Sequence, residues 1–146
     1  QAAFEHEFHE ICADARRTGR WDDPSLRQQL ASLWVRLRIM RWNSVRSLGV
    51  AESGELMPEA MIHKLYWAGL HRDMGEAAMD ALGPEATLTP YGRADNTHDA
   101  DEMEAAHRLF FFTRSDTIYG GSNQIQRNVI GERALGLPRE PRPPAR

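Results

Sequence analysis

Residues 23–48 constrain the fold more than any other stretch, because they read as one long helix with apolar residues at bundle spacing. Asp23 suits the N-cap and Pro24 the first helical position. The main apolar stripe alternates by four and three residues and consists of Leu26, Leu30, Leu33, Leu37 and Met40. A second stripe consists of Trp34, Val45 and Leu48. We therefore expect a helix that packs between neighbours, in a bundle or at an oligomer interface, with Trp42 on a second packing surface.

Four further segments carry the helical period. They cover residues 4–15, ended by Gly19; residues 58–82, ended by Gly83; residues 100–113; and residues 122–136. Between the third and fourth helices, the polar residues 85–99 predict a long loop that is mobile or covers a site. These lengths predict an all-α fold, an antiparallel bundle of four main helices and a short C-terminal helix. We assign residues 1–138 to this domain and expect 139–146 to form a flexible tail of prolines and arginines.

The third helix has a distinctive buried side. We expect it to consist of Met61, Ile62, Leu65, Tyr66, Leu70, Met74, Ala77, Ala78 and Ala81. The small residues Ala68, Gly69 and Gly75 predict that a partner helix approaches closely, since glycine within a helix otherwise costs about 1 kcal/mol relative to alanine. We expect Lys64 to point outwards.

Charge and composition exclude several classes of function. The net charge is −3 and no basic block is present, which argues against a nucleic-acid binder. No apolar run approaches the roughly 20 residues that span a bilayer, and no signal peptide is visible. Cys12 has no partner for an intramolecular disulfide, which predicts a reducing, cytoplasmic compartment. His6 and His9 lie among glutamates without a zinc-binding spacing, so we expect a solvated acidic face and no metal.

Tyr119-Gly120-Gly121-Ser122-Asn123 is the one place where paired glycines meet a helix start. Ser122 or Gly121 suits the N-cap, and Asn123 with Gln126 has capping-box spacing. The following apolar face consists of Ile125, Val129 and Ile130, and the helix is closed by Gly136 and Pro138. Free N–H groups at such a start suit a phosphate, a ribose or a carbonyl oxygen. On spacing alone, a helix–helix loop without a ligand is the more common alternative.

Residues 115–140, with Thr-Ile-Tyr-Gly-Gly-Ser-Asn-Gln-Ile-Gln-Arg-Asn at their centre, resemble the C-terminal signature of acyl-CoA dehydrogenases. Residues 15–24 and 59–64 resemble the same family in the expected order. The resemblance implies FAD, an acyl-CoA substrate and α,β-dehydrogenation to a 2-enoyl-CoA. It also implies a homodimer, a homotetramer or a mixed assembly. Only the family's C-terminal bundle is matched, so we expect the isolated chain to be inactive and to bind no flavin.

The resemblance places several functional residues. Gly120 stands where many members have the catalytic glutamate, so no catalytic base is assigned within the chain. Gly120 and Gly121 are implied to lie beside the substrate thioester. Ser122, Asn123 and Gln124 are implied to contact the adenosine part of FAD. A second flavin motif of the family, Gln-x-x-Gly-Gly, is replaced here by a segment with Asp80, Gly83 and Pro84, so flavin binding is not carried onto it.

The missing glutamate leaves three interpretations open. In the first interpretation the base lies upstream of this chain or on another subunit. The carboxylates of Asp116 and Glu132 are nearby, but no family motif supports either of them as the base. Alternatively, the chain belongs to a non-catalytic partner subunit, an interpretation supported by Gly120, Asp80 and Pro84. In a third interpretation the flavin is kept and the reaction changes to that of an oxidase. The sequence does not specify the acyl chain.

Overall fold

The structure, a computed structural model, describes residues 2–48, 58–87 and 105–139. Its α-helices are α1 (Ala2–Arg17), α2 (Pro24–Leu48), α3 (Pro58–Met61), α4 (His63–Leu82), α5 (Ala105–Asp116) and α6 (Asn123–Val129). Short 3₁₀ helices cover Arg20–Asp22 and Gly83–Thr87, and a π-helical turn covers Ile130–Ala134. No strand occurs in the described ranges, which confirms the all-α prediction. None of the helices described is long and apolar enough to cross a membrane.

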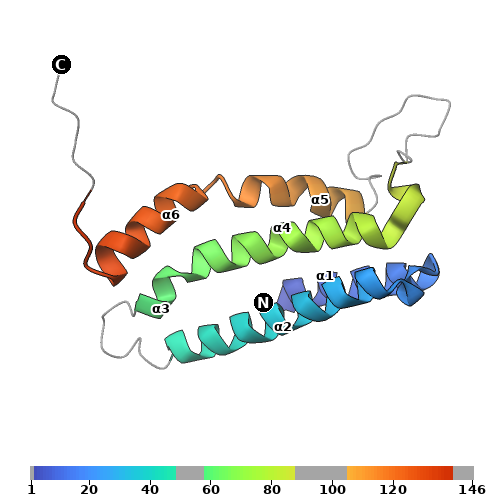
Figure 1. Cartoon of the computed structure of the whole chain (residues 1–146), viewed down its shortest axis with the longest axis horizontal. Helices are drawn as coiled ribbons and strands as arrows, with labels where there is room; N and C mark the ends of the chain where they lie inside the picture. Colours follow the sequence, from blue (N-terminus) through green and yellow to red (C-terminus); the bar gives the residue numbers. More distant parts are fainter. Residues whose placement is uncertain (1, 49–57, 88–104, 140–146) are drawn as a thin grey trace, which may run out of the picture.

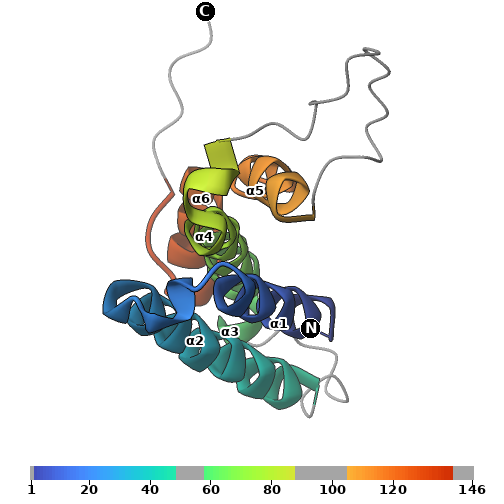
Figure 2. The same cartoon turned by 90° about the vertical axis from the view of Figure 1, so that its right-hand side faces the viewer.

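Helix α4 forms the middle of the molecule. Helices α1 and α2 lie on one side of it, and α5 and α6 lie on the other (Figures 1 and 2). The main stripe of α2 is buried as predicted, with Leu37 only 1% exposed. It packs with buried residues of α1, α4 and α5, among them Phe8, Ile11, Leu70, Met74, Leu82 and Ala106. A single apolar core therefore surrounds α4, and its burial is the main driving force for folding.

Local signals set the ends of α1 and α2 as predicted. The side-chain oxygen Oδ1 of Asp23 accepts hydrogen bonds from the N–H groups of Ser25 and Leu26, at 2.9 and 3.4 Å. Asp23 is therefore the N-cap of α2, with Pro24 in the first turn. Gly19 follows the end of α1 with φ +74°, a left-handed conformation that glycine adopts without strain.

The predicted third helix is not continuous. Helix α3 ends at Met61 and α4 begins at His63, and Ile62 between them, with φ −78° and ψ −13°, belongs to neither helix although its backbone stays in the right-handed region. The fourth helix runs on to Asp116, beyond the predicted end at Thr113, because its last residue is held by side chains of α4 described below. Of the predicted 85–99 loop, the first three residues are part of a 3₁₀ helix. Residues 88–104 lie outside the described ranges.

The expected buried side of α4 holds for its carboxyl-terminal half. Leu70, Met74, Ala77, Ala78 and Ala81 are at most 1% exposed. Towards the amino-terminal end the prediction was partly wrong. Ile62 is 37% exposed, and Met61, Leu65 and Tyr66 are only half-buried. The helix bundle thus closes tightly at one end of α4 and leaves side chains accessible at the other.

The two glycines of α4 play different roles. A Cβ atom at Gly75 would stand 2.5 Å from Oγ1 of Thr113 and 3.1 Å from the Cα atom of Phe110, so α5 can approach only because Gly75 lacks a side chain. Among the described residues, a Cβ atom at Gly69 would meet only the Arg36 guanidinium, at 3.9 Å. The close approach predicted for both is therefore confirmed at Gly75 and wrong at Gly69.

These glycines provide a matched pair of substitutions. We expect Gly75→Ala to lower the free energy of unfolding by about 1–2 kcal/mol, since overpacking outweighs the gain in helix propensity. Gly69→Ala should raise it by about 0.5–1 kcal/mol through propensity alone. Urea unfolding followed by circular dichroism measures both changes. A stabilised Gly75→Ala variant would contradict the close contact between α4 and α5.

Candidate functional site

The glycine turn after α5 has the expected backbone conformation. Gly120 and Gly121 have φ values of +64° and +95°, which side-chain-bearing residues rarely adopt. Ser122 is the N-cap of α6, and its hydroxyl oxygen accepts a hydrogen bond from the N–H of Ile125 at 3.4 Å. Gly136, with φ +66°, adopts the left-handed conformation predicted for the end of this segment. The glycine turn, the N-cap and the left-handed Gly136 are therefore confirmed, whereas the α-helix predicted over this segment ends at Val129 and continues as a π-helical turn.

The turn is tied down by its own polar groups, contrary to part of the prediction. The side chain of Gln126 donates to the carbonyl oxygen of Gly120 at 2.9 Å instead of completing a capping box. The backbone N–H of Asn123 donates to the carbonyl oxygen of Thr117 at 3.2 Å. The N–H groups expected to be free are thus partly engaged. Among the described residues, the buried side-chain oxygen of Asn123 has no hydrogen-bond partner.

The predicted apolar face of α6 is not buried within this chain. Ile125 is 54% exposed, Val129 and Ile130 are half-buried, and Gln124 is exposed. No residue of α6 counts among the buried ones. The stripe is present in the sequence, but the neighbouring elements of the described chain do not cover it.

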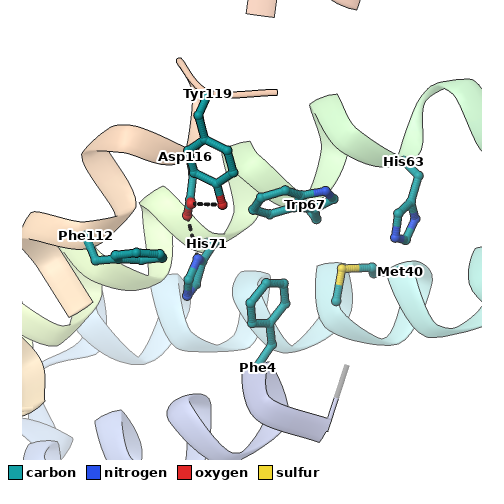
Figure 3. Close-up of a pocket in the computed structure, with 8 residues that line it drawn as sticks. All are labelled: Phe4, Met40, His63, Trp67, His71, Phe112, Asp116 and Tyr119. Atoms are coloured by element: carbon teal, nitrogen blue, oxygen red, sulfur yellow. Dashed lines mark hydrogen bonds and ion pairs between the residues drawn. The ribbon is translucent and has the colours of Figure 1, made fainter. Parts of the chain in front are cut away.

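A pocket of about 330 Å³ opens beside the glycine turn. Figure 3 shows its lining residues, which come from α1, α2, α4, α5 and the turn: Phe4, Met40, His63, Trp67, His71, Phe112, Asp116 and Tyr119. Most of these side chains are aromatic or apolar. Within the part of the chain that the structure describes, a Cβ atom at Gly120 would have only Cε of Lys64 within 4 Å, at 3.7 Å. The position of the family's glutamate is therefore sterically open in this chain.

A buried polar network lies at the base of the pocket. His71 on α4 is flanked by Asp116, whose Oδ2 lies 2.6 Å from Nδ1, and by Glu7, whose Oε2 lies 3.0 Å from Nε2. The Tyr119 hydroxyl donates to the other oxygen of Asp116 at 2.8 Å. Sequence reasoning missed His71. The available signal was a histidine next to Leu70 on the core-facing side of a helix, where polar residues need a partner.

The environment shifts the pKa values of two members of this network. Burial alone would lower the pKa of His71, but hydrogen bonds and charge attraction from Glu7 and Asp116 outweigh it and raise that pKa above its ordinary value. The hydrogen bond to Asp116 raises the pKa of the Tyr119 phenol. The arrangement favours a protonated imidazole and a neutral phenol around Asp116.

Lys64 does not point away from the domain as expected. Its ammonium group donates to the carbonyl oxygen of Asp116 at 2.5 Å. It also lies 5.6 Å from the ring centres of Trp67 and Tyr119, within the range of a cation–π interaction. The reason is local: the last carbonyl groups of α5 lack helical partners, and a cation is favoured there.

The segment that replaces the second flavin motif packs against another part of the same chain. Gly83 has φ +63°, and a Cβ atom there would lie 2.7 Å from the side chain of Arg20. Its N–H donates to the carbonyl oxygens of Asp80 and Met79 at the end of α4. Gly83 therefore serves the contact between the end of α4 and the α1–α2 connection.

Comparison with known proteins identifies the family. The family model for the acyl-CoA dehydrogenase C-terminal domain matches residues 1–135. The chain belongs to the acyl-CoA dehydrogenase family. It is a C-terminal domain of this family, as the resemblance of residues 115–140 predicted.

The relatives extend beyond this domain. Acyl-CoA dehydrogenases IpdE1 of Mycobacterium tuberculosis and of Mycolicibacterium smegmatis are each 41% identical over 140 residues, 96% of this chain, which covers 34% and 32% of their lengths. The chain thus spans about a third of these relatives.

Two solved structures share the fold. One is the "Tcur3481-Tcur3483 steroid ACAD" (TM-score 0.73, 23% identity, 94% of this chain and 35% of that one). The other is the ChsE4-ChsE5 complex from M. tuberculosis (TM-score 0.64, 23% identity, 89% and 36%).

The backbone conformation of the turn predicts different losses of stability for alanine at Gly120 and at Gly121. Gly120→Ala should lower the free energy of unfolding by about 1–2 kcal/mol, the cost of a left-handed conformation. Gly121→Ala should cost about 1 kcal/mol more, because its Cβ atom would stand 2.8 Å from Nε2 of Gln126 and disrupt the bond to Gly120. Urea unfolding checks the order, with Gln126→Ala measuring the hydrogen bond alone. Equal costs for the two glycines would contradict this description.

Proposed function

We propose that this domain acts within a flavin-dependent acyl-CoA dehydrogenase that removes the α-proton and β-hydride of an acyl-CoA thioester, with the catalytic base outside the chain. One observation carries the proposal: the glycine turn of the family borders an open, largely aromatic pocket and offers no carboxylate at Gly120. Such a pocket suits the acyl part of a thioester held next to the turn that carries Gly120 and Gly121.

The nearby carboxylates are poorly suited to act as the base. Asp116 is fully buried, and its two oxygens accept hydrogen bonds from Tyr119 and His71. Glu132 is paired with Arg139 at 3.3 Å. A general base must reach the proton that it removes, and both groups are already engaged. A base from a preceding segment of the same protein, or from another subunit, is consistent with this arrangement.

Three residues are proposed to hold the adenosine part of FAD. The side-chain oxygen of Asn123 is buried and without a partner among the described residues, so it can accept a hydrogen bond from a ligand. The Ser122 hydroxyl accepts one bond from Ile125 and keeps its own proton to donate. Gln124 is exposed beside them. When bound, the flavin would supply the acceptor for the β-hydride.

The proposed substrate is a thioester of a bulky, ring-containing acid. The name of one structural neighbour describes a steroid acyl-CoA dehydrogenase. The pocket contributes support of its own, because Phe4, Trp67, Phe112 and Tyr119 present broad aromatic surfaces to it. Flat rings pack well on such surfaces. Straight-chain and branched acyl groups are the alternatives to be compared.

We further propose that the protein is a subunit of a mixed assembly. Two structural neighbours, Tcur3481-Tcur3483 and the ChsE4-ChsE5 complex, are each named as a pair of different proteins. In this chain, Val35, Trp42 and Val45 of α2 are each more than half exposed. Apolar residues gathered on one helix face mark an interaction surface more often than a free one. A homodimer or homotetramer would use the same surface.

A reducing, cytoplasmic location is part of the proposal. Cys12 is a buried, free thiol in the core between α1 and its neighbours. Burial raises the pKa of this thiol, which keeps it protonated and unreactive. Its role is packing.

The complete protein that carries this chain provides the test. We expect it to purify with bound FAD, alone or with its partner subunit, and to reduce an artificial electron acceptor when a steroid-type acyl-CoA is added. Straight-chain acyl-CoA should give a lower kcat/KM. Protein that binds no FAD in any assembly would contradict the proposal and favour a non-catalytic partner subunit. Oxygen consumption that replaces dye reduction would indicate an oxidase.

The flavin contact is tested by a matched pair on α6. Asn123→Ala should weaken FAD binding about tenfold, the effect of one lost hydrogen bond of about 1.4 kcal/mol. Asn128→Ala, at an exposed position of the same helix, should leave it unchanged. Fluorescence titration of the apoprotein with FAD measures both constants. Equal affinities for the two variants would remove Asn123 from the site.

A further inference from the structure

His71 is an unusual core residue because both of its ring nitrogens face carboxylates. Its side chain is 5% exposed, stacks on Phe4 at a centroid distance of 4.3 Å and meets the edge of Phe112 at 6.5 Å. A neutral imidazole carries one N–H and can donate to only one acceptor. With Asp116 on Nδ1 and Glu7 on Nε2, only an imidazolium can donate to both carboxylates at once.

Asp116 links this cation to the glycine turn. The residue is fully buried at the last position of α5. One of its oxygens accepts from His71 and the other from the Tyr119 hydroxyl, while its backbone carbonyl accepts from Lys64. Tyr119 in turn packs on Trp67 at 6.3 Å. The contacts therefore run from Glu7 on α1 through His71 to the residue immediately before Gly120.

We propose that His71 is a positioning residue: as an imidazolium held between Glu7 and Asp116, it fixes the Asp116–Tyr119 pair and with it the orientation of the turn that carries Gly120 and Gly121 at the pocket. The positioning itself stands on the network, whereas its effect on acyl-CoA rests on the function proposed above. His71 does not act on the substrate directly in this proposal, since Phe4 covers one face of its ring.

Other charged groups surround the network on every side. On α1 these are His6, Glu10 and Asp14, which line a groove shared with Glu7 and His71, and on α5 the same groove includes Arg108. On α4, His63 lines the pocket and Lys64 contacts the end of α5. Among the described residues, Glu7 and Asp116 make the hydrogen bonds to the ring that the structure shows, so they are its direct charge partners.

The sign of the pH dependence follows from the raised pKa of His71. A histidine whose pKa is raised on folding contributes stability that is complete below its unfolded value of about 6.5 and is lost as pH rises through the folded value. Above that value the ring keeps one proton, and one carboxylate loses its donor. The turn should therefore be held firmly below pH 6.5 and loosen as the pH rises through the raised pKa of His71.

The experiment follows the Tyr119 ring signal by NMR in the complete protein, labelled in its tyrosine rings. The Tyr119→Phe variant, which lacks this signal, identifies it. In the wild type, we expect the Tyr119 signal to shift in step with the titration of the His71 ring nitrogens, at a pH above 6.5. Glu7 is partly exposed, so the Glu7→Gln variant should fold. This variant should lower the midpoints of both the Tyr119 and the His71 titrations by about one pH unit, because the ring loses one negative charge beside it. A Tyr119 signal that does not move with His71 in either protein would overturn the proposal.

Two further variants separate positioning from general stability. His71→Gln should abolish the pH-dependent shift of Tyr119, whereas His63→Gln, on the same helix and lining the same pocket, should preserve it. If His71→Gln does not fold, the Glu7→Gln midpoints decide the question. A preserved shift in folded His71→Gln would overturn the proposal, as would its loss in His63→Gln.

The effect on the substrate is read separately. The probe is a steroid-type acyl-CoA. In the wild type, KM should rise across the pH midpoint at which His71 titrates. Glu7→Gln should move this rise in KM to lower pH, whereas its kcat at pH 6 should differ from that of the wild type by less than twofold. If the wild type shows no acyl-CoA activity, the proposed function fails while the Tyr119 titration still decides the positioning role. A KM profile unaffected by Glu7→Gln would overturn the role of His71 in substrate binding.

Discussion

The close packing of α5 on α4 is the contact on which the rest of the site depends. It is possible because Gly75 leaves room for the backbone of Phe110 and for Thr113, which is fully buried. One helical turn further on, the same approach brings Asp116 within hydrogen-bonding distance of His71. A side chain at position 75 would displace α5 and carry the glycine turn with it. The location of the glycine turn, whose Tyr119 lines the pocket, is thus set by packing some distance away.

The network around His71 shows why the helices must dock together. A buried charge without partners costs several kcal/mol, and removing one partner of a buried pair costs about 3–5 kcal/mol. His71 on α4 needs Glu7 from α1 and Asp116 from α5, and the two bonds span sequence separations of 64 and 45 residues. No pair of these helices satisfies the imidazolium alone. The apolar core drives collapse, and this polar contact selects one relative arrangement of α1, α4 and α5.

The sequence predicted what depends on local signals. The N-cap Asp23, the core stripe of α2 and the left-handed Gly136 could all be read from neighbouring residues. The polar network could not, because the partners of His71 and Lys64 lie far away along the chain, and a histidine or lysine on a helix carries no sign of them. The burial expected for Ile125 failed for a different reason. Periodicity identifies an apolar face, but it does not say whether the same chain covers it.

The domain pairs the charges of its central network but leaves apolar side chains uncovered. Among the described residues, Glu7, His71 and Asp116 pair with one another, whereas Trp42, Ile125 and Leu135 remain more than half exposed. The chain covers about a third of its relatives' length, so covering surfaces can come from the rest of the protein as well as from another subunit. Apolar contacts impose little directional constraint, whereas the turn at Gly120 is held by directional hydrogen bonds. In the function proposed above, this division would let a neighbouring segment dock and supply a carboxylate without disturbing the geometry of the turn.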